Sequence, residues 1–163
     1  MSGPVVTALP LSAQAFAPFG DVLEISGQPD QIINQGLCGR FHDRAAMDFG
    51  GGRAGISLFH ARLCSLPHRL DLLERHPLGS QAFIPMSASR FLVVVAPDDA
   101  GRPGAPLAFI ARAGQGVNLH RGVWHAVLCP LDGTGIYAVI DRIGGGNNLE
   151  EQRIDPPVTI CGP

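Results

Sequence analysis

Glycine and proline recur so often along this chain that few long helices fit between them. Twenty-one glycines and fourteen prolines divide 163 residues into short segments, and both residue types disfavour helix interiors. Several segments are rich in β-branched or aromatic residues, as strands are. We expect strands at 55–62, 70–76, 81–86, 91–96, 107–111, 117–119, 126–129 and 136–141. The pattern predicts a mainly β, antiparallel protein.

Short strands with regular turns between them are typical of a closed barrel or jelly roll, which protects its strand edges by curling on itself. The run FLVVVAP, 91–97, is expected to be among the most buried strands. Ser12 is expected to cap one short helix through Phe16. With 45% hydrophobic residues, the chain can bury one core, so we predict a single domain over 1–163.

The charge of the chain favours a small-molecule partner. The formal net charge is −2, and no basic tract is present, which argues against nucleic acid or an anionic membrane surface. All twelve basic residues are arginine. Schiff-base chemistry through a lysine side chain is therefore excluded.

The expected location is the cytoplasm. The first twenty residues contain no basic side chain and three prolines, unlike a signal peptide. No apolar run approaches the length of a membrane span. The four cysteines lie far apart in the sequence with no short paired spacing, which suits reduced thiols rather than a disulfide framework or a zinc knuckle.

The stretch ERHPLGSQ, 74–81, places polar side chains beside an apolar run. In an extended strand Glu74 and His76 point to the same face. A bend at 77–79 would let Gln81 return to the same cavity from the next strand. The spacing resembles the first cupin motif, in which two histidines one residue apart are followed five positions later by a glutamate. Here glutamate replaces the first histidine, and glutamine replaces the glutamate.

A second stretch, GQGVNLHRGVWH, ends at His125. Its glycine turn leading to His120 resembles the second cupin motif, whose histidine completes a metal site. Strand alternation predicts that Asn118, His120 and Trp124 share one face and that His125 lies on the other, unless Gly122 allows a bulge. Trp124 is expected to form a cavity wall.

Glu74, His76, Gln81 and His120 together could hold a divalent ion. Two imidazoles favour nickel, zinc, iron or manganese over calcium, although the neutral glutamine makes this set weaker than two histidines and one carboxylate. The alternative is structural: His76 is a partly buried histidine bonded to Glu74, and His120 merely ends a strand. The spacing leaves both interpretations open.

Other polar groups carry weaker signals. His42 and Asp43 could pair at a site, but decoration of a strand end is preferred. Asp141 and Arg142 close the apolar run IYAVID, where they could form a structural ion pair or the arginine could bind an anionic substrate. The glycine clusters at 50–55 and 144–148 do not fit a phosphate loop and are expected to be flexible loops.

Taken together, ERHPLGSQAFIPM, GQGVNLHRGVWH and DRIGGGNNLEE closely resemble the ureidoglycolate lyase family, also called ureidoglycolate hydrolase, of allantoin catabolism. PLSAQAFAPFGDVLE and INQGLCGRFHD resemble its N-terminal part, so the likeness spans nearly the whole chain. It implies a cupin-like β-barrel, a homodimer, and release of urea from (S)-ureidoglycolate to give glyoxylate. It also implies a divalent metal, with nickel expected. The chain departs from the family pattern at Leu119, where tyrosine is frequent, and at Ala126, where a second histidine is common.

The resemblance also implies roles for residues at the motif positions. The implied catalytic residues are His120, Glu74, His76 and His125. The implied substrate-binding residues are Arg121, Arg142, Asn118 and Gln81, with Asp141 beside them. The metal ligands would be Glu74, His76, Gln81 and His120.

Ureidoglycolate is a carbinolamide, so removal of its hydroxyl proton drives carbon–nitrogen cleavage while the departing urea nitrogen takes up a proton. One base and one acid suffice, and no nucleophile is required. We expect His120 or Glu74 to take the hydroxyl proton and His76 or His125 to protonate urea. One of the two arginines would hold the carboxylate, and a metal would lower the hydroxyl pKa and orient the substrate.

Three other readings stay open from the sequence. A different metal-dependent cupin enzyme would be expected to carry the usual three-histidine set, which this sequence lacks. A non-catalytic small-molecule-binding cupin would bind ligand without turnover. An amidohydrolase that releases ammonia would need an activated water and usually two metals.

Overall fold

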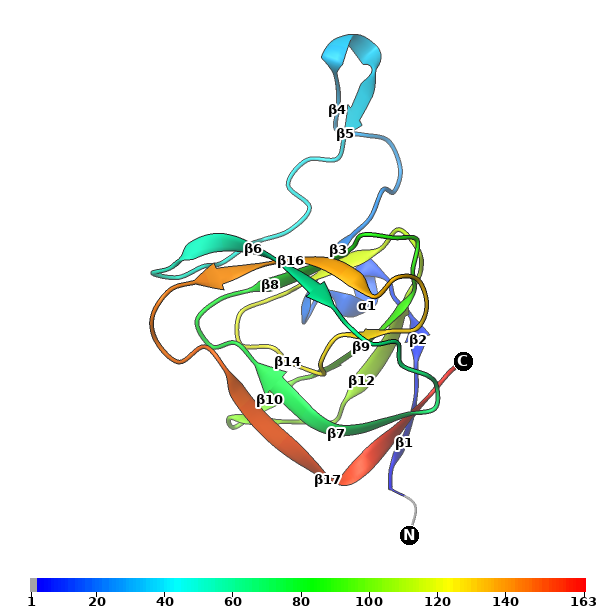
Figure 1. The fold of residues 1–163 in the computed structure, drawn as a ribbon, viewed down its shortest axis with the longest axis vertical. Helices are drawn as coiled ribbons and strands as arrows, with labels where there is room; N and C mark the ends of the chain where they lie inside the picture. Colours follow the sequence, from blue (N-terminus) through cyan, green and yellow to red (C-terminus); the bar gives the residue numbers. More distant parts are fainter. Residues whose placement is uncertain (1–2) are drawn as a thin grey trace.

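The computed structural model describes residues 3–163 and shows two sheets curled around a shared core (Figure 1). This architecture confirms the predicted cupin-like β-barrel. The eight-stranded sheet runs in the order β1 (Val5–Thr7), β17 (Glu150–Cys161), β7 (His68–Arg75), β14 (Trp124–His125), β9 (Phe91–Ala96), β12 (Leu107–Ala111) and β2 (Leu9–Pro10), with β15 (Cys129–Pro130) also paired to β9. The five-stranded sheet runs in the order β3 (Gly20–Leu23), β13 (Gly116–Leu119), β8 (Gln81–Pro85), β16 (Ile136–Ile143) and β6 (Arg53–His60).

Strand β9 forms the centre of the core, as its composition predicts. All six of its residues are buried. Phe91, Val93 and Val95 pack between the two sheets, whereas Leu92 and Val94 pack in a second cluster on the other face of β9. Because alternate residues of a strand point to opposite faces, a continuous apolar run is what a strand buried on both faces requires.

Helix α1 (Ala13–Phe16) begins where the sequence predicts. The hydroxyl of Ser12 accepts a hydrogen bond from the backbone N–H of Ala15, which satisfies a helix N-terminal donor. Phe16 packs edge-on against Phe109 of β12, with ring centroids 5.8 Å apart. The helix thereby covers one end of the core.

The eight-stranded sheet differs from the sequence-based expectation in several strands, since β1, β2, β14 and β17 were not expected. The strand expected at 126–129 is wrong: the chain is extended in β14 and β15 but forms no strand at 126–128. Strand β17 was not expected because it contains Pro156 and Pro157. It pairs with β7 on both sides of a register shift between Arg153 and Val158, and such an irregularity accommodates residues that lack a backbone donor.

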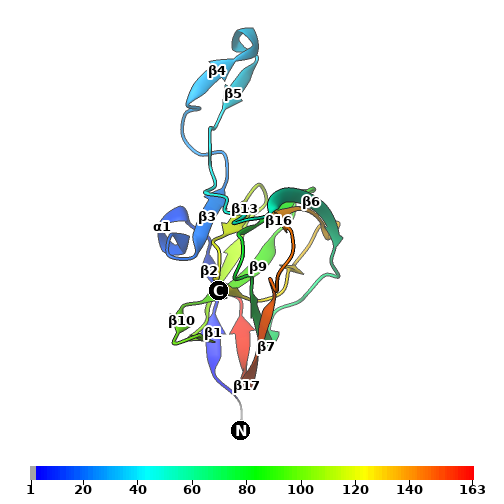
Figure 2. The same ribbon diagram turned by 90° about the vertical axis from the view of Figure 1, so that its left-hand side faces the viewer.

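A β-hairpin projects away from the barrel (Figures 1 and 2). It consists of β4 (Gln31–Ile33), a 3-10 turn at Asn34–Gly36 and β5 (Cys38–Arg40). His42 and Asp43 lie exposed at its base. A smaller hairpin joins β10 (Asp98–Asp99) and β11 (Arg102–Pro103) at the barrel surface.

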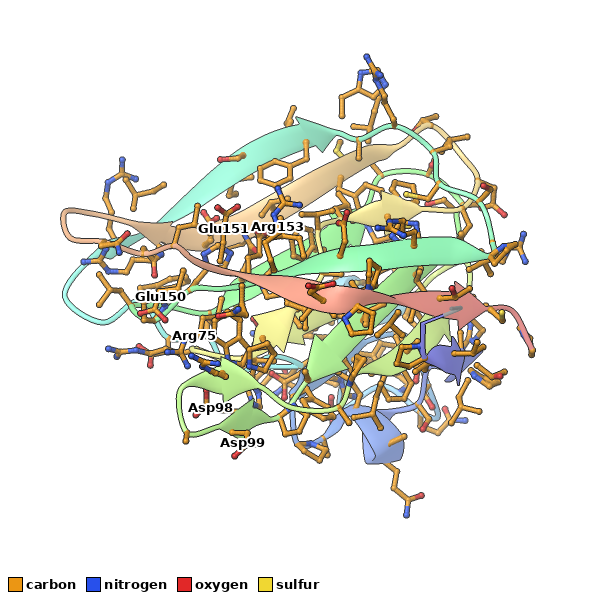
Figure 3. The ribbon with its side chains drawn as sticks, turned by 90° about the horizontal axis from the view of Figure 1, so that it is seen from below. Arg75, Asp98, Asp99, Glu150, Glu151 and Arg153 are labelled. Atoms are coloured by element: carbon orange, nitrogen blue, oxygen red, sulfur yellow. The ribbon has the colours of Figure 1, made fainter. Side chains whose placement is uncertain are left out.

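Arg75 and Trp124 lie on the outer side of the eight-stranded sheet. The guanidinium of Arg75 stacks over the Trp124 ring, 4.5 Å from its centroid. It donates hydrogen bonds to the carboxylates of Asp98 and Glu150, which lie on either side of it (Figure 3). The Trp124 indole N–H donates to Asp98. The expectation that Trp124 forms a cavity wall is therefore wrong, because its ring packs in the second core cluster. No helix among residues 3–163 is both long and apolar enough to cross a bilayer.

Candidate active site

Glu74, His76 and His125 form a compact group inside the barrel. Strand pairing places His125 of β14 directly opposite Glu74 of β7, and directly opposed residues present their side chains on the same face. His76 follows the end of β7, and its ring centroid lies 5.2 Å from that of His125. One donor atom from each of the three side chains lies within 4.8 Å of the other two. Two imidazoles and one carboxylate thus converge.

The hydrogen bonds of the two imidazoles fix where their lone pairs lie. His76 Nδ1 is 2.7 Å from the carbonyl oxygen of Asn148, and His125 Nδ1 is 3.0 Å from that of Ala126. A carbonyl oxygen only accepts, so each Nδ1 carries a proton, and in the neutral form of each ring Nε2 carries the lone pair. Both Nε2 atoms are buried without a hydrogen-bond partner among the described residues.

Burial shifts the pKa values of this group towards the neutral forms. Desolvation lowers the pKa of His125 to about 4, with a smaller contribution from the nearby His76. Desolvation also raises the pKa of Glu74, although His76 partly offsets this effect. Loss of water disfavours whichever form is charged. His125 is therefore neutral at physiological pH, and Glu74 binds a proton more readily than an exposed glutamate.

His120 lies in a different hydrogen-bond network. Its Nε2 is 3.2 Å from Asp21 Oδ2, an atom that also accepts from the Asn118 amide and the Ala46 backbone N–H, each at 2.9 Å. Burial alone would raise the pKa of Asp21, but these hydrogen bonds and the nearby His120 hold that pKa below its ordinary value. Asp21 is therefore ionised and orients the His120 ring.

The turn after His120 explains why strand alternation fails here. The chain leaves the five-stranded sheet at Leu119 and enters the eight-stranded sheet at Trp124. Gly122, with φ of +78°, occupies the connecting turn in a conformation that favours glycine. The Gly122 N–H donates to the carbonyl of His76 at 2.9 Å, so the His120 turn lies against the Glu74 group.

Arg142 lies in a cage made by both glycine clusters. A Cβ on Gly52 would lie 2.8 Å from its Nε, and one on Gly144 would lie 3.0 Å from its Nη2. The guanidinium can occupy this position only because these residues lack side chains. Arg121 Nη1 and Arg142 Nε lie 3.7 and 4.0 Å from the position that a Gly50 Cβ would occupy. The two guanidinium groups therefore approach the same point.

The pair Asp141–Arg142 does not form the ion pair that the sequence allowed. Asp141 accepts instead from the Gln81 amide at 3.1 Å. Buried side-chain atoms without a hydrogen-bond partner among residues 3–163 are His76 Nε2, Gln81 Oε1, Asn118 Oδ1, His125 Nε2, Arg142 Nε and Arg142 Nη1. Each belongs to a residue singled out from the sequence. Orphaned buried polar groups are costly and concentrate where a ligand binds.

Two participants could not be recognised from the sequence. Asp21 joins the site only because β3 pairs with β13, which places it opposite Asn118. Asn148 contributes its backbone carbonyl to His76, and its side chain accepts from the Leu78 N–H. A backbone acceptor leaves no trace in a side-chain pattern, although Asn148 lies in a glycine-rich run that the motif analysis noted.

Comparison with known proteins identifies the family. The ureidoglycolate lyase family matches residues 3–161. This chain belongs to the ureidoglycolate lyase family. It is 56% identical over 154 residues to "Ureidoglycolate lyase" of Rhodobacter capsulatus, covering 94% of this chain and 96% of that protein. It is 48% identical to "Ureidoglycolate lyase" of a Chelativorans species, covering 95% of each, and 48% identical to "Ureidoglycolate lyase 2" of Rhizobium meliloti, covering 93% and 94%.

Leu119 and Ala126, the two positions expected from the sequence to depart from the family pattern, both have apolar surroundings. Leu119 is buried in the core between the sheets, where an apolar side chain needs no hydrogen-bond partner. Ala126 packs against the second core cluster, and its carbonyl accepts a hydrogen bond from His125 Nδ1.

Replacement of Asp21 by alanine should loosen the segment around Ala46, whose backbone N–H donates to Asp21. The substitution removes the acceptor of the Ala46 N–H, and a hydrogen bond to a charged group contributes about 1.5 kcal/mol or more. We expect amide hydrogen exchange at Ala46 to accelerate by roughly tenfold or more.

Asp30→Ala is the matched control for Asp21→Ala, because Asp30 accepts hydrogen bonds from His42 and Arg44 within the projecting segment.

The effect of Asp21→Ala should depend on pH. A carboxyl group whose pKa is lowered in the folded state stabilises that state at pH values above its unfolded-state pKa, and this stabilisation is lost as the pH falls through its folded-state pKa. The difference between Asp21→Ala and wild type should therefore shrink in acid. Equal exchange at Ala46 in both proteins at neutral pH would contradict this network.

Proposed function

We propose that this chain is a ureidoglycolate lyase that cleaves (S)-ureidoglycolate to glyoxylate and urea in allantoin catabolism, as a carbon–nitrogen lyase. The observation that carries the proposal is the convergence of two imidazoles and a carboxylate in a member of this family, which also holds an arginine in a glycine cage. The hydroxyl proton and the proton gained by the urea nitrogen balance, so the reaction needs no external acid, base or nucleophile.

Glu74, His76 and His125 fit a divalent cation. Each histidine uses its Nδ1 proton on a backbone carbonyl, which is the arrangement that directs Nε2 towards a metal. Gln81 Oε1 is a further unpartnered oxygen. We place His125 in the ligand set in place of His120, because His120 bonds Asp21. Nickel is the ion that we propose, and when bound it would lower the pKa of the substrate hydroxyl as a Lewis acid.

His120 is the group that we assign to proton transfer. Asp21 holds its ring as a carboxylate does in other imidazole acid–base pairs. His120 accepts the hydroxyl proton and returns it to the urea nitrogen as the carbon–nitrogen bond breaks. The Gly122–His76 hydrogen bond keeps its turn beside the proposed metal ligands.

Arg142 is the group that we assign to the substrate carboxylate. Its Nε and Nη1 are buried without a partner among residues 3–163, and a guanidinium with free donors binds a carboxylate through charge-assisted hydrogen bonds. Arg121 is more exposed and bonds the Pro77 carbonyl and Asp48, so it contributes positive charge at the rim.

The His120→Ala variant tests the reaction and the acid–base assignment together. Purified wild-type protein should convert ureidoglycolate to equal amounts of urea and glyoxylate without ammonia. His120→Ala should lower kcat by about 100-fold or more, the usual contribution of a general acid or base, while circular dichroism stays unchanged.

His60→Ala is the control for His120→Ala, because His60 is exposed on β6 and should retain wild-type turnover. Release of ammonia by wild-type protein would indicate amidohydrolase chemistry instead. Full activity of His120→Ala would overturn its assignment alone, and absence of both urea and ammonia would overturn the proposed reaction.

Arg142→Gln should weaken substrate binding. Loss of a charge-assisted guanidinium–carboxylate contact removes about 2 kcal/mol or more, so we expect KM to rise by at least roughly tenfold. Arg153→Gln removes an exposed arginine of β17 and serves as the matched control. An unchanged KM in Arg142→Gln would show that the carboxylate binds elsewhere.

We also propose that the protein is a homodimer in the cytoplasm. Ile56 and Leu58 of the edge strand β6 are 75% and 68% exposed, and Ile84 of β8 adjoins them across Ala138. An apolar surface that crosses three strands is typical of an interface between proteins. The four free cysteines agree with a reducing compartment.

Leu58→Glu should dissociate this dimer. Burial of a leucine side chain contributes about 1.5–3 kcal/mol, and a two-fold interface loses this contribution twice. Light scattering coupled to gel filtration should report a dimer for wild type and a monomer for the variant. Leu107→Glu, on the eight-stranded sheet and also exposed, should remain dimeric. A wild-type monomer would contradict the proposal.

A further inference from the structure

A second cluster of metal-ligand side chains lies far from the candidate active site. Cys64 belongs to the loop between β6 and β7, His68 begins β7, and Cys129 begins β15. One donor atom from each lies within 4.8 Å of the other two. The cluster is at the opposite end of β7 from His76, and eight residues of extended chain span roughly 26 Å. It is therefore separate from the Glu74 group.

The backbone already holds these three segments together. The Cys64 N–H donates to the carbonyl of Pro130 at 2.7 Å, which fixes the loop against β15. His68 pairs with Ile160 of β17, and Ile160 faces the second core cluster. His68 is thus directed towards the side on which Cys129 is buried. A ligand set on secondary structure and a hydrogen-bonded loop is preorganised.

The distances are close to those of a tetrahedral site. Zinc–sulfur bonds of about 2.3 Å and zinc–nitrogen bonds of about 2.0 Å place neighbouring ligand atoms about 3.5–3.8 Å apart. Cys129 Sγ and His68 Nδ1 are 3.9 Å apart. Cys64 and His68 are partly exposed, so solvent can supply a fourth ligand and a cation can enter.

The protonation states also suit a soft cation. Burial lowers the pKa of His68, although Asp71 opposes the effect, so the imidazole keeps a lone pair. Burial, together with the neighbouring Cys64, raises the pKa of the Cys129 thiol. A thiolate is unfavourable there without a nearby positive charge, and a bound cation supplies that charge.

We propose that Cys64, His68 and Cys129 form a binding site for one thiophilic divalent cation such as Zn²⁺. Two sulfurs and one imidazole favour zinc over magnesium or calcium. The ion would join the 61–67 loop to β7 and β15 and stabilise the folded chain by binding only that state. The site is independent of the proposed reaction, because it shares no residue with the group of Glu74, His76 and His125.

Cobalt titration tests this site in the full-length protein. Reduced protein, stripped by chelation, should take up Co²⁺ with a sulfur-to-cobalt charge-transfer band in the near ultraviolet that saturates at one thiolate-bound ion per chain. The Glu74 group contains no sulfur, so cobalt bound there cannot give this band. Zn²⁺ should abolish the band by displacement and should raise the thermal unfolding midpoint.

The four cysteines provide matched variants. Cys64→Ser and His68→Gln should lose the band or weaken cobalt binding by at least tenfold, with lyase activity unchanged. Cys38→Ser changes an exposed cysteine on the projecting hairpin. Cys161→Ser changes a cysteine next to Ile160, which faces the second core cluster, so Cys161 points to the other face of β17. Both variants should keep the band. Absence of the band in wild type, or its persistence in Cys64→Ser, would overturn the proposal.

Mass spectrometry of protein purified without reductant distinguishes a bound cation from a disulfide between Cys64 and Cys129. Four free thiols with bound zinc support the site. A Cys64–Cys129 disulfide, which lowers the mass by two hydrogens and persists when zinc is supplied, would show that the pair is a redox element and would contradict a resident cation.

Discussion

A strand of two residues joins the two parts of the eight-stranded sheet. In β14, Trp124 pairs with Ala96 of β9, and His125 pairs with both Val95 of β9 and Glu74 of β7. Strands β7, β17 and β1 lie on one side of it, and β9, β12 and β2 lie on the other. The pairing that joins the sheet also brings His125 to Glu74, so the barrel and the candidate site depend on the same contact.

Burial determines the protonation state of the groups at this contact. Inside the barrel, the imidazole of His125 stays neutral, and its Nδ1 is committed to a carbonyl. His76 has the same arrangement through Asn148. Two lone pairs and a carboxylate therefore meet with no donor between them, an arrangement that is costly unless a cation or a substrate proton occupies the space. Asp21, in contrast, remains ionised because three donors compensate for its partial burial.

Local sequence was sufficient to predict those strands whose positions depend on burial alone. Strands β9 and β12 match their predicted bounds, because apolar runs between glycine and proline turns have few other solutions. Local sequence was not sufficient to predict side-chain orientation where the chain passes from one sheet to the other. The Gly122 turn lies between His120 and His125, so the alternation of one continuous strand does not apply. Strand β17 was missed because its two prolines suggest a loop, and only its pairing with β7 reveals it.

The same division applies to the site. Glu74 and His76 were found because an extended chain was expected to place them on one face, and Arg142 because it follows an apolar run. Asp21 could not be found, since a single aspartate gains its role only from the pairing of β3 with β13. The hairpin at 31–40 was also missed, because its contacts are within itself and its short strands lack strong apolar alternation.

The most direct test of the account is the protonation of the imidazoles in metal-free protein, measured by long-range proton–nitrogen correlation at neutral pH. His76 and His125 should both carry their proton on Nδ1 and show an unprotonated Nε2. Addition of a stoichiometric divalent cation should shift the two Nε2 signals together and leave His120 unchanged. A proton on Nε2 of either ring, or a cation that perturbs His120 in place of His125, would contradict the central claim that Glu74, His76 and His125 form the reactive centre.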